Sequence, residues 1–566
     1  MATIPHPFDP LKPEEISRAS RIARPHFGNQ NLNFRVITLL EPSKKEMTIF
    51  LEREQLGQHI EHTPTRCARI EVSIKGETGG NQLFELIVDL DNDTVVKKEH
   101  VEGKHSYIDT DYMKAVEKAC LANEEVQAEI RSLDLSAGAT VVVEPWAYAT
   151  DGMNDMTDRV SMVGHFMPYS NNPDANYYAY PLDICAEVSE SLQVTKVYRL
   201  PTTPHERINN EKKPFDHRRI HSTTTSEYHP DLRPSPRTTT KPYQVVQPED
   251  DGILWKHTNF RTNTPVVTRS RILVLQTIIT VSNYEYIFAW HLCQDASIFY
   301  EVRATGILST APTSIDHKET YPYGTVVAPG VLAPYHQHLF SLRIDPAIDG
   351  HANSLVIEES KPLPMDDPEI HNPFGVGYVT ESRTIEEEGG FDLDFTKART
   401  FKFINENKIN PITGTPVGFK LMPFYSQMLL AHPSSFHAKR SEFAEHAVWV
   451  TRHEDNDHFP AGKYTMQSSG GDGLASVIAK RRSTGTAQSV RNEDIVIWHT
   501  FGSTHNPRIE DWPVMPSEKL MVGLKPVNFF SGNPGLDVAP STQEQNKSVL
   551  YAGEDAEGLT CCATKV

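Results

Sequence analysis

The sequence contains no long hydrophobic run. Its longest apolar stretch, Ile272 to Val281, is interrupted by Gln276 and is too short to cross a bilayer as a helix. The first ten residues carry no lysine or arginine and no apolar core, so they do not look like a secretory signal. These absences predict a protein that is neither embedded in a membrane nor secreted, and they favour the cytoplasm.

Cysteine and basic residues are scarce. Six cysteines are scattered over 566 residues without the dense spacing of a disulfide framework, which predicts a reducing compartment. The chain has 55 lysines and arginines against 74 aspartates and glutamates, a net charge of −19. Phosphates select basic surfaces, so this balance argues against a nucleic-acid partner. An acidic surface can concentrate cationic substrates, but it fits a merely soluble surface equally.

Turn residues, by contrast, are abundant. Forty prolines and 31 glycines favour β-rich architecture over a helical bundle. The polar, proline-punctuated stretch before residue 250 cannot bury a core. We therefore predict small α+β domains at residues 6–100 and 101–205, a linker at 206–250, a large all-β sandwich catalytic domain at 251–540 and a tail at 541–566.

Local patterns predict individual elements. A helix is expected from Pro13, where proline and two acidic residues suit a first turn, and another over residues 111–132, where apolar residues recur at helical spacing. Strands are expected from alternating or β-branched runs at residues 35–40, 83–88, 140–144, 272–281, 298–302, 324–327, 339–344, 446–451 and 495–498.

A His-x-His pair lies beside one of these expected strands. Side chains alternate along a strand, so His336 and His338 point to the same face and can hold one metal ion. Imidazole ligands alone suit copper or zinc. Because the chain has 25 histidines, a chance pair of surface or core histidines fits the pattern too. The Asn-Tyr-Glu-Tyr run at residues 283–286, taken alone, predicts only a strand with two aromatic residues.

Three motifs taken together resemble the copper amine oxidase family. They occur in the family's order: Asn-Tyr-Glu-Tyr at 283–286, His-Gln-His at 336–338 and His-Asn-Pro-Arg-Ile-Glu-Asp-Trp-Pro-Val-Met-Pro at 505–516. The run 251–308 around the first motif, and Glu-Pro-Trp-Ala at 144–147, are similar to the family as well. The resemblance spans approximately residues 6 to 540.

This resemblance implies a cofactor and a reaction. Tyr284 would be the precursor of topaquinone and would form a Schiff base with the substrate, with Asn283 and Glu285 as its cofactor-binding neighbours. The implied reaction is oxidative deamination of a primary amine by molecular oxygen, which gives an aldehyde, ammonia and hydrogen peroxide. A homodimer is implied too, and some fungal and plant relatives work in peroxisomes. The implied copper ligands are His336, His338 and His505.

The resemblance also suggests a second cation site. Asp345 and Asp494 occupy the places of carboxylate ligands in some relatives, and the backbone carbonyl of Ile495 is a further candidate. Oxygen ligands suit calcium or another divalent cation. Ala347 stands where some relatives have a side-chain oxygen, and ordinary surface carboxylates remain the alternative.

The chain departs from the family between Glu249 and Asp251. The family has a segment there, comparable to a small domain, with an Asp-Ala-Gly-Glu-Tyr-Gly-type motif whose aspartate is the catalytic base. No such motif is present in this sequence, so the general base is not found. Asp250, Asp251 and Asp295 have no positional support as substitutes.

Two explanations of this departure stay open. The chain is a gene-model error or splice form of an ordinary enzyme, or it has truly lost its base. True loss makes a non-catalytic copper-binding protein the alternative function. A zinc hydrolase built on the three histidines is a third hypothesis, but it leaves residues 283–286 unexplained. The preferred amine cannot be predicted from the sequence.

Overall fold

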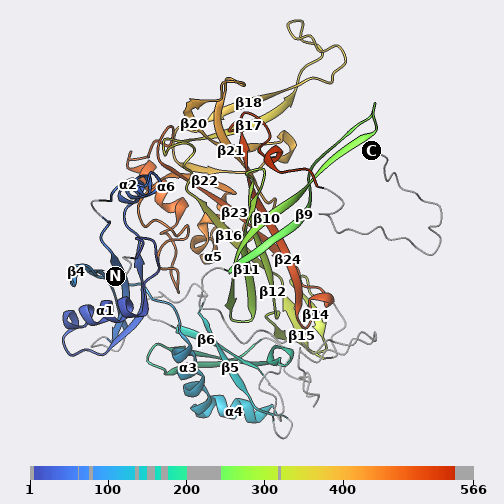
Figure 1. The fold of residues 1–566 in the computed structure, drawn as a ribbon. Helices are drawn as coiled ribbons and strands as arrows, with labels where there is room; N and C mark the ends of the chain where they lie inside the picture. Colours follow the sequence, from blue (N-terminus) through green and yellow to red (C-terminus); the bar gives the residue numbers. More distant parts are fainter. Residues whose placement is uncertain are drawn as a thin grey trace.

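Two small mixed units and one large β-sheet unit make up the chain (Figure 1). The structure is a computed structural model. It describes residues 5–60, 63–75, 81–133, 135, 139–148, 160–166, 176–200, 244–315 and 320–541. No helix in these ranges is long and apolar enough to cross a membrane, and no disulfide joins the four cysteines within them.

The first unit packs helix α1 on a four-stranded antiparallel sheet. Pro13 opens α1, acidic residues fill its first turn, and Ala19 and Ala23 face the sheet core. A capping box between Ser43 and Glu46 starts helix α2. The elements are α1 (Pro13–Ala23), η1 (Arg24–Phe27), β1 (Leu32–Leu40), α2 (Lys44–Gln55), β2 (Cys67–Lys75), β3 (Asn81–Asp89) and β4 (Thr94–His100).

The second unit combines two helices with another four-stranded sheet. The helix predicted over residues 111–132 is divided at Asn123, whose backbone is extended and whose side chain accepts hydrogen bonds from the N–H groups of Glu125 and Val126. The elements are α3 (Thr110–Ala122), α4 (Glu124–Ser132), β5 (Val142–Ala147), β6 (Val160–Phe166), η2 (Tyr177–Ala179), β7 (Pro181–Ser189) and β8 (Val194–Arg199).

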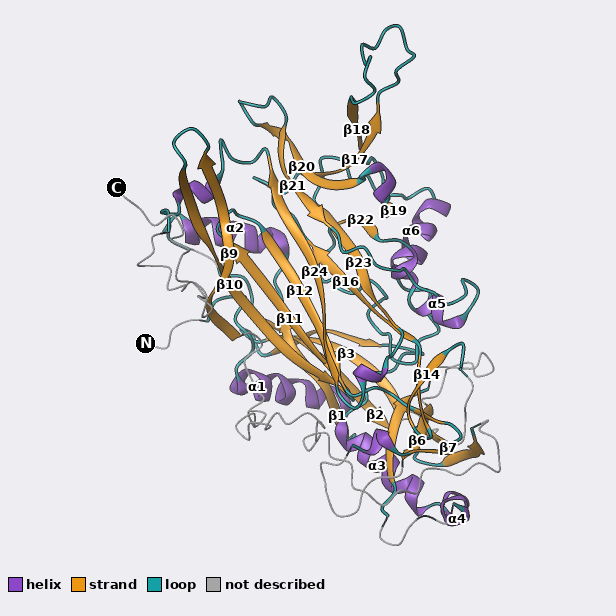
Figure 2. Cartoon of the chain, turned by 90° about the vertical axis from the view of Figure 1, so that its right-hand side faces the viewer, coloured by secondary structure: helices purple, strands orange, loops and turns teal. Residues whose placement is uncertain are grey.

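The large unit is built on a nine-stranded antiparallel sheet, which Figure 2 shows running the length of the molecule. Its strand order is β18-β17-β20-β21-β24-β12-β11-β10-β9. The strands are β9 (Gln244–Asn259), β10 (Thr264–Val281), β11 (Tyr284–Cys293), β12 (Ile298–Gly306), β17 (Ser354–Pro362), β18 (Tyr378–Thr384), β20 (Thr400–Ile409), β21 (Pro416–Met422) and β24 (Met515–Val527).

A four-stranded sheet, in the order β16-β23-β22-β19, packs against the large one. Leu342 and Phe501 of this sheet share a buried cluster with Phe401, Phe403 and Val522 of the nine-stranded sheet, so the two sheets enclose a sandwich core. The predicted fold class, small α+β domains followed by a large β-sandwich, is confirmed. The strands are β16 (His336–Ile344), β19 (Gly389–Phe391), β22 (Val448–Arg452) and β23 (Ile495–His505).

Short elements complete the large unit. They are β13 (Ala311–Pro312), β14 (Gly324–Ala328), β15 (Val331–Pro334), η4 (Phe395–Lys397), α5 (Phe436–Arg440), η5 (Glu442–Glu445), α6 (Leu474–Ser483), η6 (Ile509–Asp511) and η7 (Pro534–Asp537). The strand β9 begins inside the stretch predicted as a linker, most of which lies outside the described residues. The predicted domain limits themselves stay predictions.

The predicted joint between Glu249 and Asp251 lies inside strand β9. The pairing of β9 with β10 slips three times around this point, and Gly252 has a positive φ of 80°. The long β9–β10 hairpin forms one edge of the nine-stranded sheet (Figure 2). The joint is therefore built into an irregular but continuous edge strand.

Near its end, β10 carries exposed apolar side chains on one face. Ile279 and Val281 lie directly opposite Tyr286 and Tyr284 on β11, so they share the face of those tyrosines. Ile279 is 43% exposed and Val281 is 51% exposed. No residue of β10 belongs to the sandwich core, so among the described residues the second sheet does not extend over this strand.

Candidate metal centre

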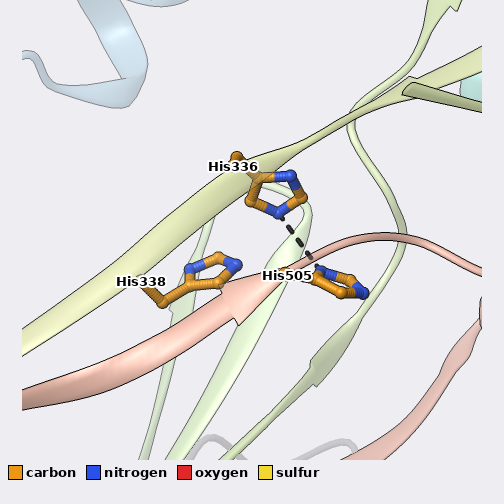
Figure 3. A group of neighbouring side chains, drawn as sticks. All are labelled: His336, His338 and His505. Atoms are coloured by element: carbon orange, nitrogen blue, oxygen red, sulfur yellow. Dashed lines mark hydrogen bonds between the residues drawn. The ribbon is translucent and has the colours of Figure 1, made fainter. Parts of the chain in front are cut away.

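Three histidines from two neighbouring strands converge at one point (Figure 3). Antiparallel pairing places His336 of β16 opposite His505, the last residue of β23. The alternation along β16 turns His338 to the same side. One ring nitrogen of each histidine lies within 4.8 Å of the others. Within the described ranges this is the only group of three or more potential ligand side chains so close together.

Each ring has a separate partner that orients it. The Nδ1 of His336 donates to the Pro334 carbonyl at 2.8 Å. The Nε2 of His505 lies 3.3 Å from Asp511 Oδ2, and His338 Nδ1 lies 2.8 Å from the Tyr286 hydroxyl. One nitrogen per ring is thus engaged outside, which leaves the other for a metal ion. Such outer hydrogen bonds fix the tautomer and orientation of metal-binding histidines.

Burial favours the neutral form of His336 and His338. Removal from water, together with the neighbouring histidines, lowers the pKa of His336 and lowers the pKa of His338 to about 4. A neutral imidazole is the form that binds a metal. The donor set therefore fits copper or zinc.

Tyr284 lies directly beside the histidines. Its hydroxyl is 3.1 Å from His336 Nε2, and it accepts a hydrogen bond from the Ser309 backbone N–H at 3.3 Å. Tyr286 projects from the same face of β11, and burial raises its pKa to about 12. Residues 283–286 and the histidine motifs, which are far apart in the sequence, thus meet at one site.

The two sequence neighbours of Tyr284, Asn283 and Glu285, form hydrogen bonds with different parts of the molecule. The Asn283 amide donates to the Ile307 carbonyl at 2.6 Å and to the Ser309 hydroxyl at 3.0 Å, so it ties the turn before Tyr284 to the loop after β12. The Glu285 carboxylate instead accepts from the Thr280 hydroxyl at 2.8 Å, on the opposite face of the strand from Tyr284.

A buried carboxylate of the second unit also reaches this turn. Glu144 Oε1 accepts hydrogen bonds from the Ser282 and Tyr178 hydroxyls, each at 2.5 Å. The Tyr178 carbonyl accepts from the Thr310 hydroxyl at 2.6 Å. The second small unit therefore holds both the turn and the loop that flank Tyr284.

The site opens into a cavity of about 380 Å³. The carboxylates among its described lining residues are Asp511 and Glu518. Asp511 accepts from Arg508, which holds its pKa below the usual range against the opposing effect of burial. Glu518 accepts from the Ser503 hydroxyl at 2.7 Å. Both carboxylates are thus already engaged by neighbouring side chains.

The aspartates considered as substitute bases lie elsewhere. Asp250 forms ion pairs with Arg269 and Arg271, and Asp295 accepts from Ser297 in the turn after β11. This turn is at the opposite end of β11 from Tyr284, and nine residue steps of strand correspond to about 30 Å. Asp250 and its neighbour Asp251 lie on β9 opposite Arg271, at the same far end of the sheet, so none of the three aspartates can reach the site.

The residues proposed for a second cation lie together, but with a lysine between them. Lys44 Nζ is 2.5 Å from Asp345 Oδ1 and 2.5 Å from Asp494 Oδ1. Ile495 follows as the first residue of β23 and is fully buried. A calcium ion and this ammonium group cannot occupy the same space, so the residues as arranged do not fit the cation.

Sequence reasoning missed several of these contacts. Asp511 lies inside the family-like run at 505–516, so it could have been singled out there. Glu144 lies in the Glu-Pro-Trp-Ala run, whose contact with Ser282 no spacing indicates. Lys44 is separated from Asp345 by 301 residues, and nothing in the sequence connects the two.

Comparison with known proteins gives consistent matches. Residues 238–545 match the family model described as copper amine oxidase, enzyme domain, and residues 6–101 match the copper amine oxidase N2 domain. Copper amine oxidase 1 of Aspergillus niger is 33% identical, with 99% of each chain covered. The peroxisomal primary amine oxidase of Pichia angusta is 40% identical over 56% of this chain and 46% of its own.

The same likeness holds for a solved structure. The copper-containing benzylamine oxidase from Hansenula polymorpha superposes with a TM-score of 0.83 at 29% identity, covering 95% of this chain and 100% of that one. The alignment with the Aspergillus protein runs over 690 positions, whereas this chain has 566 residues. The relative therefore has residues without a counterpart here.

Proposed function

This chain belongs to the copper amine oxidase family, and from that premise we propose that it oxidises primary amines with one copper ion and a quinone formed from its own Tyr284. The proposed copper ligands are His336, His338 and His505. The observation that carries the proposal is the 3.1 Å approach of the Tyr284 hydroxyl to His336 Nε2, beside two further histidines. A zinc hydrolase would give this tyrosine no role.

Copper and the quinone, when present, supply the redox chemistry: two electrons pass from the amine to oxygen, giving aldehyde, ammonia and hydrogen peroxide with the uptake of water. The chain's own residues supply position. Ser309 N–H and Asn283 hold the ring and its turn, and Asp511 orients His505. Preorganisation of this kind keeps the reacting groups aligned.

We propose that this chain turns amines over slowly, because the family's base segment is absent. The cavity carboxylates Asp511 and Glu518 are already bonded to Arg508 and Ser503, which supports the lack of a free base. Loss of general-base catalysis typically costs about 10²- to 10⁴-fold in rate. A gene-model error or splice form remains the preferred origin, and a non-catalytic copper protein is the second candidate.

Two further properties belong to the proposal. We expect a homodimer, as the family resemblance implies, and a cytoplasmic or peroxisomal location, since the Pichia relative is named as peroxisomal. The net charge of −19 would favour the approach of protonated amines.

The test measures hydrogen peroxide release by the copper-loaded chain with a panel of alkyl and aryl amines. We expect a visible quinone band, a mass increase on the Tyr284 peptide, and slow turnover that rises when a relative's base segment is inserted. Tyr284→Phe should remove both the band and the turnover. An unmodified Tyr284 peptide after copper loading in oxygen would sink the cofactor claim, while a band without turnover would favour the non-catalytic alternative.

A further inference from the structure

We propose that the ammonium group of Lys44 replaces the second cation in this chain, so that no calcium or other divalent ion binds between Asp345 and Asp494. The proposal concerns a site separate from the copper centre and does not depend on the amine oxidase activity. It predicts that substitution of Lys44 alone allows a divalent cation to bind between the two aspartates.

Distance is the first argument. Lys44 Nζ lies 2.5 Å from one oxygen of each aspartate. Calcium is held by oxygen ligands at about 2.3–2.6 Å. The lysine nitrogen thus occupies the point where a shared ion would lie. An ion could enter only after the whole side chain had moved away from both carboxylates.

Charge is the second argument. Asp345 also lies 3.5 Å from Arg343 Nη1 and 3.4 Å from His453 Nε2. Three carboxylates, those of Asp345, Asp494 and the nearby Asp455, therefore already face the two basic side chains of Lys44 and Arg343. A divalent ion added to this group would leave an excess of positive charge in a partly buried place, which is unfavourable at low effective dielectric constant.

The backbone of Lys44 is also fixed in position. It is the first residue of α2, where the Ser43–Glu46 capping box fixes the helix start. Its own backbone N–H donates to Asp455 Oδ1 at 2.9 Å. A cation at a helix N-terminus is disfavoured by the helix dipole, so the two aspartates compensate for the unfavourable position of this side chain.

The calcium ligands are incomplete even without the lysine. Calcium takes six to eight oxygen ligands, and Ala347 adds no side-chain oxygen. The position borders a cavity of about 500 Å³ that is lined by residues of both α2 and the sandwich, including Lys44 and Asp345. Once the ammonium is removed, water can complete the coordination of an ion between the two carboxylates, which would otherwise repel each other.

The test compares calcium binding by the copper-loaded full chain and its variants, using isothermal titration with CaCl₂ and thermal unfolding with and without calcium. The wild type should bind no calcium at this site and show no calcium-dependent shift in Tm. Lys44→Met should bind one calcium ion per chain, and calcium should raise its Tm by mass action. Adding Asp494→Asn should abolish the gain.

The matched control is Lys45→Met, which removes the same charge from an exposed position one residue along α2; it should behave like the wild type. Wild-type protein that binds one calcium ion, with loss of binding in Asp494→Asn, overturns the proposal. So does a folded Lys44→Met that gains no calcium binding. If Lys44→Met does not fold, Lys44→Gln serves in its place, and the wild-type titration still decides.

Discussion

Tyr284 depends on a neighbour that has no side chain. Gly306 lies opposite it in the β11–β12 pairing, with a φ of 114°. A Cβ atom at this position would lie 2.9 Å from Tyr284 Cα and would press on the Asn283 carbonyl as well. Only glycine combines this backbone conformation with so close an approach.

We therefore expect Gly306→Ala to displace Tyr284 and to lower the free energy of unfolding by about 1–3 kcal/mol. The quinone band after copper loading should fall by more than about tenfold, because the tyrosine hydroxyl moves away from His336. Gly485→Ala is the matched control, since Gly485 also has a positive φ but open space around it. An equal loss of colour in both variants would contradict the argument.

His499 is a second residue whose chemistry is set by its surroundings. It is fully buried, its Nδ1 donates to the Ala447 carbonyl at 2.9 Å, and its Nε2 accepts from the Phe424 N–H at 3.3 Å. Burial lowers its pKa to about 4. The unfolded chain, with a histidine pKa of about 6.5, therefore binds more protons between these two values.

Folding stability should thus be complete above pH 6.5 and should fall as the pH drops toward 4. At pH 5 the loss from this residue is about 2 kcal/mol. Urea unfolding at pH 7 and pH 5 measures it, and His499→Gln should show a correspondingly smaller pH dependence. The idea fails if the variant and the wild type lose the same stability.

At the scale of elements, each of the nine strands predicted from the sequence overlaps a strand of the structure, but their ends differ and other strands, such as β2 and β20, were not predicted. The expected strand at 272–281 is the second half of β10, because the polar first half, starting at Thr264, is stabilised by pairing with β9. The helix expected over 111–132 is broken at Asn123, where a capping side chain prevails over the continuing apolar spacing. The spacing of apolar residues along the sequence does not reveal such competition between local and tertiary contacts.

The turn between β10 and β11 gives a prediction at this scale. Glu144→Ala should release the Ser282 hydroxyl and slow the growth of the quinone band about fivefold, since one well-placed hydrogen bond is worth about 1 kcal/mol. Glu144→Gln keeps an accepting oxygen and should restore most of the rate. A rate that is lost equally in both variants, with copper bound, would point to a role for the charge instead.

At the scale of the molecule, turn density and motif order predicted the two small units and the sandwich. The family resemblance implied that the three histidines and Tyr284 belong to one site. The sequence could not predict how the units contact each other. The pair of Lys44 and Asp494, for example, joins residues 450 positions apart.

The exposed apolar side chains near the end of β10 should make the protein bind hydrophobic dyes and associate with itself. Exposed apolar patches of this kind bind hydrophobic dyes and promote association. We expect the folded, copper-loaded chain to increase the fluorescence of anilinonaphthalene sulfonate, and Ile279→Ser together with Val281→Ser to reduce the increase by about half or more. Insertion of a relative's base segment should reduce it too. An unchanged signal in the double variant would place the dye elsewhere.

The pairing of His336 with His505 has a consequence for the time course of folding. These residues are 169 positions apart in the sequence, so the metal ligands come together only when β16 and β23 have paired. Closing so long a stretch of chain is entropically costly and slow. The time at which copper added during refolding becomes bound therefore reports a late folding step, the assembly of the two sheets of the sandwich.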